Sequence, residues 1–137
     1  MKRRIVIFLI LFTPFLTLAE TDNAENQAVQ AAKTWLALVD AGAYGQSWEK
    51  AAAYFKVAVQ KTQWNQTATA VRGPLGAVVS RSLKSATYVT SLPGAPDGEY
   101  VVIQFSSSFQ NKAAATETVT PMLDKNGQWR VSGYYIN

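Results

Sequence analysis

The hydrophobic residues of this chain change their spacing near Gly76, and this change limits the folds that the chain can adopt. Before Gly76 they recur every three or four residues, the period of an α-helix, and after it they alternate with polar residues, the period of a β-strand. Helices that all precede the strands indicate an α+β fold. We therefore expect three N-terminal helices packed on a curved, cone-like, four-stranded antiparallel meander sheet.

Capping and stop signals place the three expected helices. The first follows the capping-box pattern Asp22-x-x-Glu25 and ends before Gly42. Ser47 has the features of an N-cap for a second helix over 47–59. The third helix begins at Thr62 and ends at the Gly-Pro pair that follows residue 72.

The part of the chain after Gly76 contains four segments with the alternation of a strand. They are 78–92, 100–109, 113–123 and 129–136. Asn126-Gly127 is a two-residue hairpin signal between the last two segments. Because no repeat or linker divides the chain, we expect one α+β domain over 20–137.

The first nineteen residues have the features of a secretory signal peptide. Basic residues at 2–4 precede an apolar run over 5–18, which ends in the small-residue step Thr17-x-Ala19. The run is shorter than the roughly 20 residues that cross a bilayer, so we expect cleavage after Ala19 and no stable membrane anchor. The mature chain is then exported, to the periplasm or the medium.

The composition excludes several classes of function. The chain has no cysteine and no histidine, which removes thiol chemistry, histidine acid–base catalysis and the usual zinc sites. Three of the 13 basic residues lie at positions 2–4, so the mature chain keeps ten against nine acidic residues, a net charge near +1. Nucleic acid would require a clustered basic face. We expect no cofactor, no metal and no nucleic-acid partner.

Four motifs in the mature chain resemble a known family. They are Trp35-Leu-Ala-Leu-Val-Asp40-Ala-Gly42-Ala-Tyr44-Gly-Gln-Ser47-Trp48, Arg72-Gly-Pro74-Leu75-Gly76 with Arg81, Asp97-Gly98-Glu-Tyr100 and Trp129-Arg130-Val-Ser-Gly133-Tyr134-Tyr135-Ile136. This set resembles the bacterial exported domain-of-unknown-function family 4019, and the resemblance implies no assigned activity. The order of segments is also similar to cone-shaped domains of the nuclear-transport-factor-two and cystatin-like kinds, in which helices wrap a bent sheet around a pocket.

Asp40 and Arg81 are the two charged residues whose positions are least favourable locally. Asp40 lies in the last turn of a helix, where the macrodipole disfavours a carboxylate by about 0.3–1 kcal/mol. Arg81 interrupts an apolar strand face. Either Arg81 pairs with Asp40 or Glu117, or it binds an anionic ligand, and a bulge near Gly76 would instead turn it into solvent. Asp40 is either held by a nearby donor, which is the Trp48 indole, Ser47, Arg72 or Arg81, or it serves as a pocket carboxylate.

Tyr134 and Tyr135 complete the candidate pocket with Asp40, Arg81 and Glu117, and as neighbours on a strand they point to opposite faces. We expect a non-catalytic domain that binds a small ligand or an envelope protein through the sheet face or cone pocket, or dimerises through its outer face. The alternative is a cone-fold enzyme, isomerase- or dehydratase-like, with Asp40 as base and Tyr134 or Tyr135 as acid. An unpaired Asp40 in an open apolar pocket would favour the enzyme. A hydrogen-bonded Asp40 in a filled cone would favour the binding domain.

Overall fold

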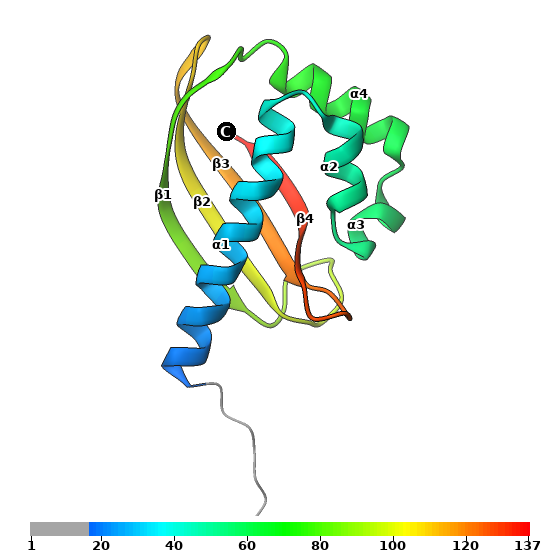
Figure 1. Cartoon of the computed structure of the whole chain (residues 1–137), viewed down its shortest axis with the longest axis vertical. Coiled ribbons are helices and arrows are strands. Elements are labelled where there is room, and N and C mark those ends of the chain that lie inside the picture. The colour runs from blue at the N-terminus through cyan, green and yellow to red at the C-terminus, as the bar shows by residue number, and fades with distance from the viewer. Residues whose placement is uncertain (1–16) are drawn as a thin grey trace, which may run out of the picture.

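Helices precede strands in residues 17–137, the part of the chain that the computed structural model describes (Figure 1). The helices of this part are α1 (Leu18–Asp40), α2 (Tyr44–Lys50), α3 (Ala53–Ala58) and α4 (Lys61–Arg72). Its strands are β1 (Val78–Val89), β2 (Tyr100–Phe109), β3 (Lys112–Leu123) and β4 (Trp129–Ile136). The strands pair antiparallel in the order β1-β2-β3-β4. The expected α+β fold with a four-stranded antiparallel meander is confirmed.

Helix α1 begins earlier than the sequence predicts. Thr17 is its N-cap: the Thr17 side chain accepts from the Glu20 N–H, and the Glu20 carboxylate accepts from the Thr17 N–H. The capping box is therefore at Thr17 and not at Asp22. The first sixteen residues of the expected signal peptide lie outside the described residues. Within 17–137, no helix combines the length and the hydrophobicity that a membrane crossing requires.

The C-terminal end of α1 is a Schellman motif built on Gly42. The Gly42 N–H donates to the Val39 carbonyl at 3.0 Å, and the Ala43 N–H donates to the Leu38 carbonyl at 2.9 Å. Gly42 has a φ of 73°, in the left-handed region that a glycine adopts without a side-chain clash. This stop, predicted from the sequence, holds Asp40 in the last turn of α1.

The second expected helix is divided into α2 and α3. Ala51 and Ala52 are extended, with ψ of 166° and 149°, and the Ala52 N–H donates to the Val131 carbonyl of β4 at 2.7 Å. This contact with the sheet replaces the helical hydrogen bond that would have continued the helix. The prediction that Ser47 caps a helix is also wrong, because Ala43 is the N-cap and Ser47 is buried inside α2.

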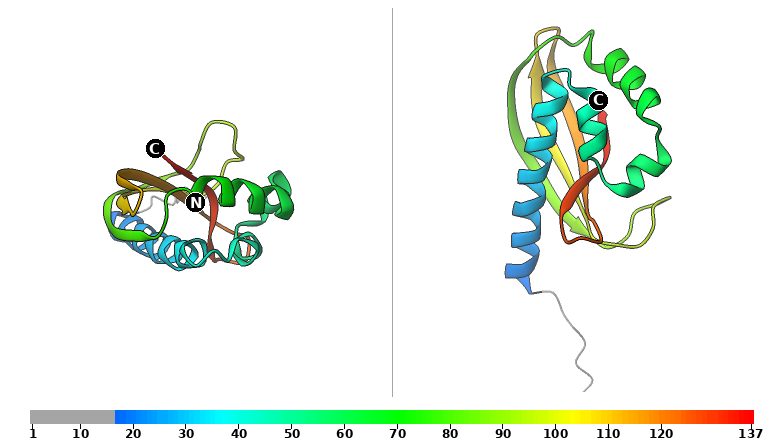
Figure 2. Two further views of the ribbon diagram at one scale, coloured as in Figure 1. Left: turned by 90° about the horizontal axis from the view of Figure 1, so that it is seen from above. Right: turned by 45° about the vertical axis from the view of Figure 1, so that its right-hand side comes forward.

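Helix α1 runs along one face of the sheet (Figure 2), and the core lies between this face and the helices, with Phe55 of α3 and Trp64 of α4 adding to it. The buried residues of α1 recur at helical spacing, and Val101, Ile103 and Phe105 alternate along β2 with exposed fractions of 1% or less. These side chains fill the space over this face of the sheet, which is the filled rather than the open alternative left by the sequence. The sheet is not strongly curled, so the cone-like part of the prediction is not supported.

Strand β1 contains two bulges, one at Val79 and one at Lys84. Between them Arg81 lies opposite Ser107, whose side chain is buried on the core face. The bulge near Gly76, which was one of the alternatives in the sequence analysis, is therefore present. It leaves Val79 in solvent, 66% exposed, while Arg81 stays on the core face.

The turn between β3 and β4 has three residues rather than the two that Asn126-Gly127 indicated. The Asp124 N–H donates to the Gln128 carbonyl at 2.8 Å, and the Gly127 N–H donates to the Asp124 carbonyl at 2.9 Å. Positive φ values occur only at glycines in the described residues, which rules out a type I′ turn at Asn126. The start of β4 at Trp129 is nevertheless as predicted.

Candidate functional site

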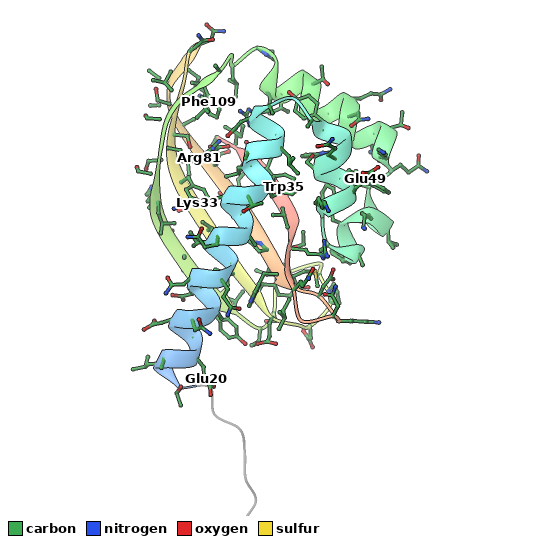
Figure 3. All side chains as sticks on the ribbon, in the orientation of Figure 1. Glu20, Lys33, Trp35, Glu49, Arg81 and Phe109 are labelled. Carbon is green, nitrogen blue, oxygen red and sulfur yellow. The ribbon has the colours of Figure 1, made fainter. Side chains whose placement is uncertain are left out.

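Polar side chains from α1, α4 and all four strands of the sheet meet near the C-terminal end of α1. We call this set the buried charge cluster: Asp40, Arg72, Arg81, Ser107, Glu117 and Tyr134. Arg81 lies between β1 and the C-terminal half of α1 (Figure 3). The cluster contains two guanidinium groups and two carboxylates, so its formal charge is zero.

Arg81 binds both carboxylates of the cluster at once. Its Nη1 lies 2.8 Å from Asp40 Oδ2, and its Nη2 lies 3.0 Å from Asp40 Oδ1. On the other side, its Nε lies 2.7 Å from Glu117 Oε1, and its Nη2 lies 3.2 Å from Glu117 Oε2. The two pairings that the sequence offered as alternatives therefore coexist. Such paired geometry is specific to the planar guanidinium.

Glu117 is the most deeply buried charge of the cluster, with a fully inaccessible side chain. Besides Arg81, it accepts a hydrogen bond from Ser107 Oγ at 2.5 Å and another from the Tyr134 hydroxyl. Burial, and next to it the negative charge of Glu117, raises the pKa of the Tyr134 hydroxyl above its ordinary value. The Tyr134 hydroxyl therefore stays protonated and donates a hydrogen bond to the Glu117 carboxylate.

Asp40 is held by two arginines. Besides Arg81, the Arg72 Nη2 donates to Asp40 Oδ1 at 2.8 Å. Burial acts to raise the pKa of Asp40, but the hydrogen bonds and charges of Arg81 and Arg72 outweigh it and hold that pKa below its ordinary value. Two of the donors named from the sequence thus bind Asp40, whereas the Trp48 indole donates to the Val59 carbonyl instead.

An unpaired Asp40 in an open apolar pocket would have favoured an enzyme, and the structure does not show one. Asp40 is hydrogen-bonded by arginines, and its lowered pKa makes it a poor base, while the raised pKa of Tyr134 makes it a poor acid. Effective acid–base groups have pKa values near the working pH. Within 17–137, no group of three or more Asp and Glu side chains gathers that could hold a metal ion.

Tyr135 does not join the other candidate residues. It lies on the opposite face of β4 from Tyr134 and is 55% exposed. Tyr134 instead packs edge-on against Trp35, with ring centroids 5.4 Å apart. The expectation that the two tyrosines face opposite sides is confirmed. Tyr135 lies outside the hydrogen bonds of the buried charge cluster, but with Tyr134 it lines the pocket between α4 and β4.

Two members of the cluster were not among the predicted pocket residues: Ser107, which the sequence reasoning did not consider, and Arg72, which it named only as a donor to Asp40. Arg72 continues the stripe of Trp64 and Ala68 at intervals of four residues, so it lies on the buried face of α4. Ser107 continues the alternation of buried residues along β2. A polar residue that continues the buried positions of a helix or strand therefore indicates a polar side chain that is paired within the core.

A small pocket lies beside the cluster, between α4 and β4. It has a volume of about 220 Å³ and is mainly apolar. Its lining residues are Trp64, Thr67, Ala68, Val71, Arg72, Tyr134, Tyr135 and Ile136. Val71 is 44% exposed, whereas Arg72 is 5% exposed and its Nε has no hydrogen-bond partner among the described residues. The pocket therefore has apolar walls, and one of its lining residues, Arg72, has a buried Nε that donates to no described residue.

Comparison with known proteins agrees with the resemblance seen in the sequence. None of the curated proteins compared with the chain matches it. A family model described as "Protein of unknown function (DUF4019)" matches residues 31–134, from the middle of α1 to Tyr134 in β4. Because this match covers more than half of the chain, the chain belongs to the DUF4019 family.

Proposed function

We propose that the chain is an exported, non-catalytic binding domain whose binding site is the pocket between α4 and β4. Export is supported by the signal-peptide features of residues 1–19. The observation that carries the binding role is the apolar pocket itself, one of whose lining residues, Arg72, keeps a buried Nε without a hydrogen-bond partner among the described residues. A buried donor without a partner has a free-energy cost that a bound acceptor relieves.

The charge of the cluster defines the chemistry of the ligand. The two arginines are already neutralised by Asp40 and Glu117. An anionic ligand would therefore add an unbalanced charge to a buried site, which is unfavourable. The ligand is better described as an apolar group that carries one uncharged acceptor, such as a carbonyl oxygen. A small molecule and the side chain of a protein partner both provide this chemistry.

Binding of benzamide, followed by methyl NMR spectroscopy of the purified protein, tests the proposal. Benzamide has an apolar ring and one amide, and for its size we expect a Kd on the order of 1 mM. The methyl signals of Ala68 and Val71 should shift as benzamide is added. Toluene, which has the ring but no acceptor, should bind more weakly.

Two exposed valines on neighbouring helices supply matched variants. Val71→Lys places a charge at the pocket, whereas Val57→Lys places the same charge on α3 at a side chain that is 89% exposed. Val71→Lys should abolish the benzamide shifts, and Val57→Lys should leave them unchanged. The proposal fails if benzamide shifts no pocket signal, or if the two variants behave alike.

A further inference from the structure

We propose that the partner of this domain is an extended peptide segment that adds to β4 as a fifth strand and places one side chain in the α4–β4 pocket. This inference rests on the proposed function, because it names the kind of partner that the pocket takes. In strand addition, main-chain hydrogen bonds supply affinity, and pockets for alternate side chains supply specificity.

The hydrogen-bond pattern of β4 leaves main-chain groups free at its open edge. Thr116 of β3 and Asn137 exchange both main-chain hydrogen bonds, each at 3.0 Å. In an antiparallel pair, every second residue bonds to its neighbour strand, so the main chain of Tyr135 is directed to β3. The N–H and C=O groups of Tyr134 and Ile136 are therefore directed away from β3, towards the edge.

Only the C-terminal half of this edge is open. At the other half, the Val131 carbonyl accepts from the Ala52 N–H at 2.7 Å, so the link between α2 and α3 covers it. A register shift at Ser132 separates this covered half from the segment Gly133–Ile136. Among residues 17–137, no strand pairs with the outer side of that segment.

The two edge strands of the sheet, β1 and β4, differ in the features that prevent a further strand from pairing. β1 carries bulges at Val79 and Lys84, and Lys84 is exposed. Bulges and lysines are the features by which natural sheets prevent pairing at an edge. The open segment of β4, 133–136, has neither a charge nor a proline, and Tyr135 within it is 55% exposed. The chain thus protects one edge and leaves a short part of the other available.

One hollow lies on each face of the sheet beside the open segment, where the side chains of an added strand would point in turn. The α4–β4 pocket lies on the core side, next to Tyr134 and Ile136. A second hollow of about 210 Å³ includes Gly133 and Thr120, which lie on the outer face of the sheet. Successive side chains of a strand point to opposite faces, so neighbouring residues of the peptide enter the two hollows in turn. Both residues should be uncharged, because neither hollow offers an unpaired charge.

A short synthetic peptide with N-methylated derivatives tests the mode of binding. The probe is acetyl-Thr-Val-Ser-Val-Thr-amide, which is uncharged and alternates as a strand does. One derivative is N-methylated at both valines, and the other at the serine and the second threonine. An added strand donates from alternate residues only, so one derivative should lose binding and the other should retain it.

A pair of variants at Ile136 tests the same contact from the side of the domain. Ile136→Pro removes the edge N–H without removing a hydrogen bond to β3, and Ile136→Ala keeps that N–H but shortens the side chain. We expect Ile136→Pro to weaken peptide binding about tenfold more than Ile136→Ala does. Thermal melting of both variants checks that each is folded.

The outcomes separate this inference from the proposed function. If the peptide binds at the pocket but neither N-methylation nor Ile136→Pro matters more than its control, the pocket is a binding site and strand addition is wrong. If the peptide does not bind although benzamide does, strand addition is also wrong. Self-association that Ile136→Pro abolishes would assign the edge to a second copy of the chain and overturn the peptide assignment.

Discussion

Arg81 holds two carboxylates of very different exposure. Asp40 retains Arg72 when Arg81 is removed, whereas Glu117 loses its cationic partner and keeps only the hydroxyls of Ser107 and Tyr134. A buried carboxylate without a cation is unfavourable, because its desolvation is no longer offset. The contribution of Arg81 to stability therefore lies mainly in its pairing with Glu117.

We predict that Arg81→Met destabilises the domain by about 3–5 kcal/mol, because it leaves Glu117 buried and unpaired. The double variant Arg81→Met with Glu117→Gln should be more stable than Arg81→Met alone, because it also removes the unpaired charge of Glu117. Urea unfolding of the wild type, both single variants and the double variant measures the coupling. Additive losses would show that the two side chains act independently.

Lys61→Met provides the control for this cycle. Lys61 forms an ion pair with Glu49 at 2.6 Å, but both side chains are substantially exposed, 44% and 56%. Water screens such a pair, so its loss should change the free energy of unfolding little. A large effect of Lys61→Met would mean that any charge removal destabilises this fold.

The sequence predicted part of the cluster from local conflicts. Asp40 at a helix C-terminus and Arg81 within an apolar strand both required a partner, and the structure supplies one for each. The sequence did not predict that one arginine would serve both acids. That outcome depends on the bulge at Val79, which sets the face on which Arg81 lies, and bulge positions follow from how the finished sheet packs.

Two indole groups hold α2 against its neighbours. Trp35 of α1 donates its Nε1–H to the Ser47 carbonyl at 2.8 Å, and Trp64 of α4 donates its Nε1–H to Ser47 Oγ at 2.9 Å. Ser47 Oγ in turn donates to the Tyr44 carbonyl at 2.6 Å. One buried serine therefore connects three helices.

We predict that Ser47→Ala destabilises the domain by about 1–3 kcal/mol, because it leaves the buried Trp64 N–H without an acceptor. Trp64→Phe in the Ser47→Ala background should cost less than Trp64→Phe alone, since no donor is then left unpaired. Thermal unfolding measures both effects. Ser82→Ala on exposed β1 is the control, and equal losses at the two serines would contradict the role given to Ser47.

The division between α2 and α3 shows where element prediction fails. Local propensity favours one continuous helix through Ala51 and Ala52, since alanine is the best helix former. The chain instead extends there so that Ala52 can bond to Val131, which is 79 positions later in the sequence. No local pattern contains that partner. The strands, whose alternation reflects a single buried face, were predicted closely.

For the whole molecule, we predict that export removes residues 1–19. The cut after Ala19 would separate Thr17 from Glu20 and so remove the capping box of α1. The first turn of α1 should then fray back towards Asp22, whose side chain becomes the next available cap. Intact-mass measurement of exported protein identifies the new N-terminus, and amide exchange reports the fraying.

Ala19→Leu supplies the control for processing, because it removes the small residue from the expected cleavage site. This variant should accumulate at full length. Exported wild-type protein that retains residues 1–19 would contradict the signal-peptide assignment. Unchanged amide protection of residues 21–23 after cleavage would contradict the predicted loss of the cap.

The buried charge cluster also has a consequence for the order of folding. Its members are spread from Asp40 in the first helix to Tyr134 in the last strand. Until β4 is in place, closing the sheet over Glu117 would bury a carboxylate that lacks part of its hydrogen bonding. Early collapse of the helices on an incomplete sheet is therefore penalised. Contacts between such distant residues also form slowly. We therefore expect the native packing around Glu117 to form only once the last strand is available.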